Sequence, residues 1–115
     1  MEYKTEYSLQ ERICQTQEIL MKYPDKIPII CEKNHKSNFT HAIDKKKYLV
    51  PFDFTVGQFM YVIRKRLKLS SEYGLYFFID GYIPASNKLI SEIYNKYRDN
   101  DGYLYIIYSM ENTFG

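Results

Sequence analysis

The sequence predicts a single α+β domain, in which a mixed sheet wraps around one amphipathic helix and further helices cover the other face of the sheet. Two observations predict it. Short apolar, strand-like runs alternate with helical stretches along the 115 residues. Several of these runs are apolar on both faces, which is typical of strands covered on both sides. A chain of this length buries a core without disulfides or metal ions.

A helix is predicted over residues 9–22. Ser8 and Glu11 form a Ser-x-x-Glu capping box at its first turn. Pro24 ends the helix, because the residue before a proline avoids the α region. Residues 27–32 follow as a strand whose odd- and even-numbered side chains face opposite sides. Isoleucine occurs on both sides of it, so we expect both faces of this strand to be covered.

Residues 45–67 form the most informative stretch, a basic strand that leads into a helix. Pro51 closes the strand because proline cannot donate to a ladder. Thr55 and Gln58 form a second capping box. The apolar residues of the helix share one face at spacings i, i+3, i+4, i+7 and i+11: Val56, Phe59, Met60, Ile63 and Leu67.

Two more strands follow, with a shorter helix between them. Residues 75–79 are an apolar run that ends at Asp80-Gly81, a hairpin-type turn signal. A short helix is predicted over residues 87–96. The last strand, residues 103–108, is apolar on both faces and is therefore expected in the centre of the sheet. This order predicts a ubiquitin-like β-grasp with two N-terminal helices packed on the sheet.

Composition narrows the function. The formal net charge is +2, so the basic runs at residues 45–47 and 64–68 favour solvated faces over a nucleic-acid site. The start of the chain lacks the apolar segment of a signal peptide, and no run approaches the ~20 apolar residues of a membrane span. We therefore expect a soluble, intracellular chain.

Chemistry-bearing residues are few. Cys14 and Cys31 lack metal-ligand spacing, and His35 and His41 have no carboxylate cluster beside them. The sequence contains no nucleophile elbow and no nucleotide-binding loop. We therefore predict no enzyme, no metal site and no cofactor.

Several short motifs stand in order along nearly the whole chain. They are KYPDKIP at 22–28, CEK at 31–33, DKKKYLVP at 44–51, TVGQF at 55–59, IRKR at 63–66, FF at 77–78, YLY at 103–105 and FG at 114–115. With these motifs the chain resembles the autophagy ubiquitin-like modifiers, the family of GABARAP and microtubule-associated light chain 3. The DGYLY segment at 101–105 and the terminal glycine are similar to those of certain protozoan members.

The resemblance implies a modifier without catalysis of its own. Activating and conjugating enzymes would join Gly115 to phosphatidylethanolamine, and a cysteine protease would process or delipidate it. The implied divisions are a helical extension over residues 1–24, a ubiquitin-like core over 25–109 and a flexible conjugation tail over 110–115. The protein would be cytoplasmic, and on autophagosomal or related membranes when lipidated. The sequence leaves open whether Gly115 is the native end or a processed one.

The resemblance also implies docking of aromatic-x-x-aliphatic receptor peptides with flanking acids, which add as a strand along residues 45–50. The expected aromatic pocket consists of Ile19, Pro28, Ile30, Lys47, Leu49 and Tyr103. The expected aliphatic pocket consists of Tyr48, Val50, Pro51, Phe54, Phe59, Val62 and Ile63. The expected contacts to the peptide's acids are Lys45, Lys46 and Arg66, with Lys47 beside them.

Alternatives stay open. Ile30, Val50 and Ile63 could be core residues instead of pocket residues. The chain could be a non-conjugated peptide-binding module, or a lipidated modifier that serves a plastid-type organelle. Four positions depart from the family pattern. Gln15 stands where many members carry glutamate beside the aromatic pocket, Lys26 replaces a usual arginine, Tyr103 replaces phenylalanine and Phe54 replaces a common leucine.

Overall fold

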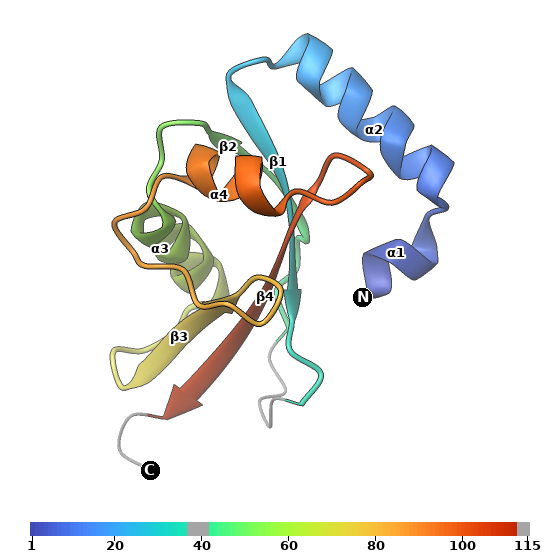
Figure 1. Cartoon of the computed structure of the whole chain (residues 1–115). Helices are drawn as coiled ribbons and strands as arrows, with labels where there is room; N and C mark the ends of the chain where they lie inside the picture. Colours follow the sequence, from blue (N-terminus) through green and yellow to red (C-terminus); the bar gives the residue numbers. More distant parts are fainter. Residues whose placement is uncertain (37–41, 113–115) are drawn as a thin grey trace.

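The structure, a computed structural model, describes residues 1–36 and 42–112 of the chain. Its sheet has the strand order β2-β1-β4-β3. The strands are β1 (Lys26–Lys33), β2 (Lys47–Pro51), β3 (Tyr73–Phe78) and β4 (Leu104–Asn112). The central strands β1 and β4 run parallel, and the two outer pairings are antiparallel. This mixed sheet is the one predicted, and β4 is central as expected (Figure 1).

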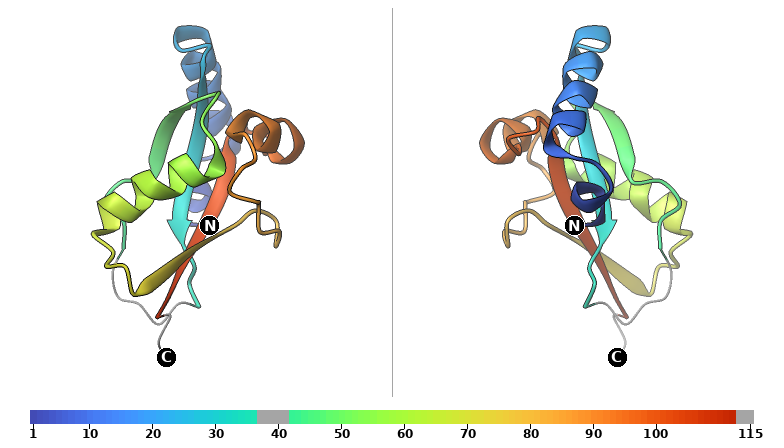
Figure 2. Two further views of the ribbon diagram at one scale, coloured as in Figure 1. Left: turned by 90° about the vertical axis from the view of Figure 1, so that its left-hand side faces the viewer. Right: turned by 90° about the vertical axis from the view of Figure 1, so that its right-hand side faces the viewer.

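Four helices cover the sheet: α1 (Glu2–Glu6), α2 (Leu9–Lys22), α3 (Val56–Leu67) and α4 (Ile90–Tyr97). The two side views show α1 and α2 on one face and α3 on the other (Figure 2). The α+β fold with two N-terminal helices on the sheet is therefore confirmed. None of the helices within the described residues is long and apolar enough to cross a membrane.

Both predicted capping boxes are present. Ser8 Oγ accepts from the Glu11 amide at 3.2 Å, and Glu11 Oε1 accepts from the Ser8 amide at 2.9 Å. Thr55 and Gln58 exchange the same pair of bonds at the start of α3. These bonds satisfy amides that the first turn of a helix leaves free, so the helix starts are determined locally.

The sheet separates two clusters of buried side chains. The larger lies under α3 and α4 and includes Ile29, Phe59, Ile63 and Leu104, all fully buried. The smaller lies under α1 and α2 and is built mainly of tyrosines. It contains Tyr3, Ile30, Tyr103 and Tyr105, with Tyr7 and Ile19 packed against it. These two clusters explain why the strands are apolar on both faces.

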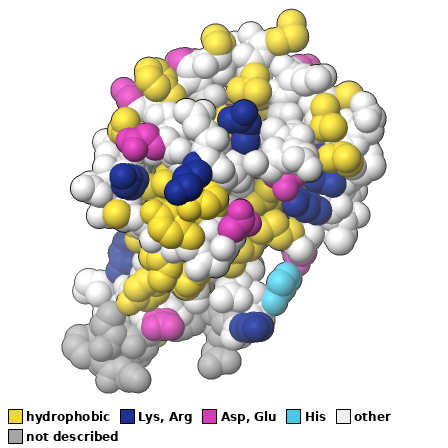
Figure 3. All heavy atoms as spheres, viewed as in Figure 1, with side chains coloured by type: hydrophobic (Ala, Val, Ile, Leu, Met, Phe, Trp, Pro, Cys, Tyr) yellow, Lys and Arg dark blue, Asp and Glu magenta, His cyan; other side chains and the backbone are white. Residues whose placement is uncertain are grey.

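In the view of Figure 1, hydrophobic side chains gather on the surface over β3 and the segment between β3 and α4, with basic and acidic side chains around them (Figure 3). Single exposed apolar residues are ordinary on a protein surface. The most exposed aromatic residue of α3 is Tyr61, which points away from the core. This face is distinct from the one that α1 and α2 cover.

The end of the chain differs from the expected boundary. β4 continues to Asn112, and Met110 is buried opposite Leu75 of β3. Residues 110–112, which were expected in the tail, thus belong to the sheet. Their backbone pairs with residues 73–75 of β3, although the sequence around them is polar. Gly115 and His41 lie outside the described residues. The short helix also starts later than expected, at Ile90, because the Lys88 carbonyl accepts from the Val56 amide of α3.

Candidate functional site

The expected docking edge is an outer strand of the sheet. β2 is the last strand in the order and pairs on its inner side with β1, where Tyr48 lies opposite Ile29. Its outer side has no strand partner among the described residues. An unpaired strand edge presents free N–H and C=O groups, which an added peptide strand satisfies. The backbone of β2 therefore suits strand addition.

Side chains of β2 alternate between the two sides of this edge. Tyr48 and Val50 point to the α3 side and are almost fully buried. Lys47 and Leu49 are exposed, and Leu49 is 38% exposed. The alternation predicted from the sequence thus holds. It leaves one apolar side chain of the strand accessible next to α2.

A shallow pocket of about 210 Å³ lies between α2 and β2. Of the residues expected in the aromatic pocket, Ile19 and Lys47 line it directly. Pro28, Ile30 and Tyr103 are buried, and Ile19 packs against the cluster that contains Ile30 and Tyr103. The buried residues can therefore support the pocket from within the sheet, while its accessible wall comes from α2.

Sequence reasoning missed part of that wall. The pocket is also lined by Glu18, Lys22 and Tyr23, which were not expected there, and by Gln15, which the resemblance placed beside it. With Ile19, the α2 residues fall at spacings i, i+3, i+4 and i+7, which is one face of a helix. Helical periodicity extended from Ile19 would have indicated them. The charged members of this face make the pocket amphipathic.

Two of the departures from the family pattern, Gln15 and Tyr103, lie together. Gln15 Oε1 accepts hydrogen bonds from the Tyr103 hydroxyl at 2.7 Å and from the Tyr3 hydroxyl at 2.5 Å. Burial raises the pKa of Tyr103, so its hydroxyl remains a neutral donor. The Tyr103 hydroxyl, absent from phenylalanine, thus gives Gln15 a fixed partner below the pocket. Because this amide oxygen already accepts two bonds, it is a poorer acceptor for an incoming peptide group.

On the α3 side, the expected aliphatic pocket divides into buried and accessible parts. Phe59 and Ile63 are fully buried in the larger core, and Tyr48 and Val50 of the same core are almost fully buried. Pro51, Phe54 and Val62 are partly exposed. The accessible residues are the ones that a peptide side chain could touch in this conformation, whereas the buried ones form the core behind them.

The residues expected to meet the peptide's acids already have partners. Lys46 Nζ lies 2.5 Å from Glu2 Oε2 and 3.0 Å from Glu6 Oε1. These hydrogen bonds raise the pKa of Lys46, and the bond from Lys46 lowers the pKa of Glu2. Arg66 pairs with Asp44 at 3.3 Å. An acidic peptide therefore competes with carboxylates of the chain itself.

Lys45 has a different environment. Its Nζ lies 5.2 Å from the ring centroid of Tyr48 and is exposed on the docking edge. An ammonium group over an aromatic face is attracted by the ring quadrupole, weakly at an exposed site. Among the three residues expected to bind acids, Lys45 therefore gives up the weakest interaction when its side chain turns toward a carboxylate of the peptide.

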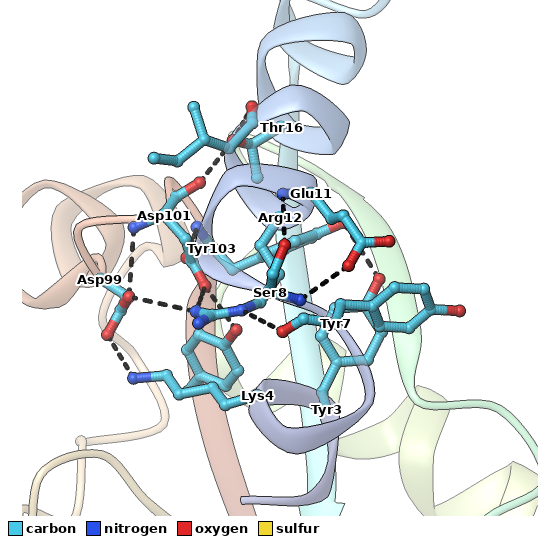
Figure 4. Close-up of polar contacts among 12 residues, drawn as sticks. Tyr3, Lys4, Tyr7, Ser8, Glu11, Arg12, Thr16, Asp99, Asp101 and Tyr103 are labelled. Carbon is cyan, nitrogen blue, oxygen red and sulfur yellow. Dashed lines mark hydrogen bonds and ion pairs between the residues drawn. The ribbon is translucent and has the colours of Figure 1, made fainter.

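A buried polar network holds α1 and α2 against the turn that precedes β4 (Figure 4). The Asp101 side chain accepts from Arg12 Nη1 at 2.6 Å, from the Tyr105 hydroxyl at 2.6 Å and from the Tyr103 amide at 2.8 Å. At the surface, Lys4 pairs with Asp99 at 2.6 Å. This network positions α2, and with it the wall of the aromatic pocket.

The same turn approaches α2 closely. The Thr16 hydroxyl donates to the Asp101 carbonyl at 2.5 Å. Gly102 has φ of +93°, and a Cβ atom there would lie 2.5 Å from Thr16 Oγ1. Only glycine meets both conditions without strain. The partners come from residues 12–16 and 101–105, so no local pattern in the sequence indicates the network.

Comparison with known proteins places the chain among close relatives. The family described as "Autophagy protein Atg8 ubiquitin like" matches residues 11–115. Autophagy-related protein 8 of Schizosaccharomyces pombe is 55% identical over 114 residues, which cover 99% of this chain and 93% of that protein. The protein of the same name from Mycosarcoma maydis is 52% identical over 113 residues, covering 98% and 95%.

Solved structures agree with the fold. The crystal structure of Trypanosoma brucei Atg8 superposes with a TM-score of 0.92 at 40% identity, covering 100% of this chain and 98% of that one. Plasmodium falciparum Atg8, solved in complex with a Plasmodium falciparum Atg3 peptide, gives 0.83 at 34% identity, covering 93% and 94%. Identity to these protozoan proteins is thus lower than to the two fungal relatives.

Proposed function

The chain belongs to the Atg8 family of ubiquitin-like autophagy proteins, and we propose that it is conjugated through Gly115 to phosphatidylethanolamine and recruits receptor peptides to autophagosomal membranes. The receptors would carry an aromatic-x-x-aliphatic motif. The chain would act as a conjugated tag and a docking surface, without catalysis of its own. It would be cytoplasmic before conjugation and membrane-bound after it.

The observation that carries the docking proposal is the free outer edge of β2 beside the pocket of α2. A peptide strand on this edge would alternate its side chains between the α2 side and the α3 side. Its aromatic residue would enter the pocket at Ile19 and Lys47, and its aliphatic residue would meet Pro51, Phe54 and Val62. Lys45 would contact the peptide's acids first, since Lys46 and Arg66 are paired within the chain.

A peptide of the conjugating enzyme is a second proposed occupant of the same edge. The Plasmodium falciparum relative was solved with an Atg3 peptide. We therefore expect the conjugating enzyme and the receptors to compete for one surface. Such competition would release the modifier from its enzyme once receptors are abundant.

The conjugation proposal depends on Gly115. A residue without Cβ on a short terminal segment can thread a narrow enzyme active site. The attached phospholipid would contribute two acyl chains, which is what stable membrane anchoring needs. An activating enzyme, a conjugating enzyme and a processing or delipidating cysteine protease are the implied partners.

The test is intact mass after incubation with ATP, the activating and conjugating enzymes and liposomes that contain phosphatidylethanolamine. We expect a lipid adduct on the native chain and a loss of at least tenfold in its yield with Gly115→Ala. Absence of the adduct, with enzymes that are active on another substrate, would contradict conjugation. A non-conjugated peptide-binding module would then be the better account if peptide binding persists.

A further inference from the structure

One side-chain amide lies between the buried tyrosines and the pocket beside β2. Gln15 lines this pocket of about 210 Å³ and is half-buried. Its Oε1 accepts from the Tyr103 hydroxyl at 2.7 Å and from the Tyr3 hydroxyl at 2.5 Å. Both tyrosines belong to the smaller cluster under α1 and α2. The oxygen of the amide is therefore turned toward the buried cluster.

The opposite orientation of this amide would leave buried donors without an acceptor. Tyr3 is 6% exposed and Tyr103 is fully buried. Apart from Gln15, the two hydroxyl groups have only each other among the described residues, at 3.5 Å. That contact satisfies one donor at most, and buried donors are rarely left unpaired. The oxygen of Gln15 thus stays on the tyrosine side, which leaves its nitrogen for the pocket side.

The pocket offers more to an acceptor than to a donor. In the described part of the chain, the Gln15 Nε2 group donates to no other residue. Lys22 and Lys47, which line the same pocket, also carry only donors. The side-chain acceptors of the lining, those of Glu18 and Tyr23, are exposed. A hydrogen bond to them replaces one to water and therefore gains little.

We propose that Gln15 selects the aromatic residue of the docked peptide and favours tyrosine over tryptophan. A tyrosine hydroxyl accepts as well as donates, so it can take a hydrogen bond from the Gln15 Nε2 group. The indole N–H of tryptophan only donates, and in this pocket it would face a donor. Burying that N–H without an acceptor offsets part of the gain from the larger ring. The proposal rests on the proposed docking of peptides at β2.

The test uses the full chain and labelled peptides in a fluorescence-polarisation assay. The peptides share one sequence and differ at the aromatic position, which is tyrosine, phenylalanine, tryptophan or benzothienylalanine. The last is a tryptophan isostere in which sulfur replaces the N–H group. On the native chain we expect tyrosine to bind about fivefold more tightly than phenylalanine, and tryptophan no more tightly than its isostere.

Gln15→Glu is the matched variant, because it exchanges the pocket-side donor for an acceptor of the same shape. One carboxylate oxygen can keep the bonds from Tyr3 and Tyr103. On this variant we expect tryptophan to bind about tenfold more tightly than its isostere, since hydrogen bonds to charged groups are stronger. Glu92→Gln, on an exposed position of α4, should change neither comparison.

Three results of this assay would overturn the proposal. The first is equal binding of tyrosine and phenylalanine on the native chain. The second is a native chain that binds tryptophan clearly more tightly than the isostere; loss of that preference with Glu18→Gln would then identify Glu18 as the acceptor. The third is a Gln15→Glu chain that gains nothing for tryptophan.

A second readout does not depend on peptide docking. Side-chain amide protons on the pocket side exchange with water, whereas protons bonded to the buried tyrosines would be protected. Gln17 is exposed on the same helix and serves as the reference. We expect the Gln15 side-chain amide to exchange at a rate similar to that of Gln17, measured by NMR, and strong protection of Gln15 would overturn the proposal. Failure of every peptide to bind either chain, with an unprotected Gln15 amide, would instead contradict docking itself, and the preference with it.

Discussion

The two faces of the sheet are held in different ways. Under α3, buried side chains such as Phe59, Ile63 and Leu104 form a core that is mainly apolar, with a few hydroxyl groups such as that of Tyr108. Under α1 and α2, tyrosines pack beside a buried ion pair of Arg12 with Asp101. The first face depends on non-directional burial, and the second on hydrogen bonds with fixed geometry. The N-terminal helices are therefore the part that conditions can loosen without unfolding the core.

The proposed functional elements lie where these two faces meet. β2 has Tyr48 in the apolar core and Leu49 on the α2 side. A peptide added to β2 would thus rest on a rigid wall at its aliphatic end and on an adjustable wall at its aromatic end. Perturbing each face separately tests this contrast.

The largest effect is expected from Phe59→Ala. Phe59 is fully buried and makes ring contacts with Tyr48 and Phe77. Loss of its transfer free energy, together with the cavity left behind, should lower the free energy of unfolding by about 4 kcal/mol. Urea denaturation monitored by circular dichroism measures this change. A loss below about 1 kcal/mol would contradict the assignment of Phe59 to the core.

Asp101→Ala should cost somewhat less and act more locally. It leaves the Arg12 charge buried without its partner, which typically costs about 3 kcal/mol. We expect faster amide hydrogen exchange in α1 and α2, with β1 and β4 less affected. Asp53→Ala, in an exposed turn, is the control. Uniform acceleration across the sheet would show that the two faces are not separable.

Acidification should loosen α1 before it unfolds the core. The hydrogen bond from Lys46 lowers the pKa of Glu2. Burial alone would raise the pKa of Asp99, but Lys4 and the Asp101 amide together lower it. A lowered pKa in the folded state gives stability that is present above the ordinary value and is lost as pH falls through the folded value. The contribution should therefore be complete at neutral pH and be lost progressively as the pH falls below about 4.

Amide resonances of α1, followed by NMR from pH 7 to pH 3, measure this loosening. We expect the Tyr3 amide to lose its protection while the amides of β1 and β4 keep theirs. Simultaneous loss of protection in all three elements would mean that α1 does not detach independently of the sheet. Glu2→Gln should remove part of the pH dependence.

The smallest effect is expected from Glu2→Gln combined with Glu6→Gln. The double change frees Lys46 for a peptide carboxylate, so peptides with flanking acids should bind about twofold more tightly, as exposed ion pairs are weak. Peptides without acids should be unaffected. Fluorescence polarisation at low salt measures both, with Glu92→Gln as the control. Unchanged affinity for the acidic peptide would show that α1 does not compete for Lys46.

Much of this protein was determined by local sequence. The capping boxes at Ser8 and Thr55, the apolar stripe that contains Phe59 and the alternation of β2 depend on neighbours within a few residues. These patterns gave the helices, the strands and their buried faces. They also placed Tyr48 and Leu49 on opposite sides of the docking edge.

Tertiary structure alone decided how those surfaces are occupied. Alternation assigns Val50 to a face, but only packing under α3 makes it core rather than an open pocket wall. Lys46 meets Glu6 across 40 residues, and Arg12 meets Asp101 across 89. Such partners are invisible to local patterns, because ion pairs and burial depend on which distant segments the fold brings together. The helices and strands thus follow from local sequence patterns. Which side chains are buried or ion-paired, and which stay accessible to a peptide, follows from the packed fold.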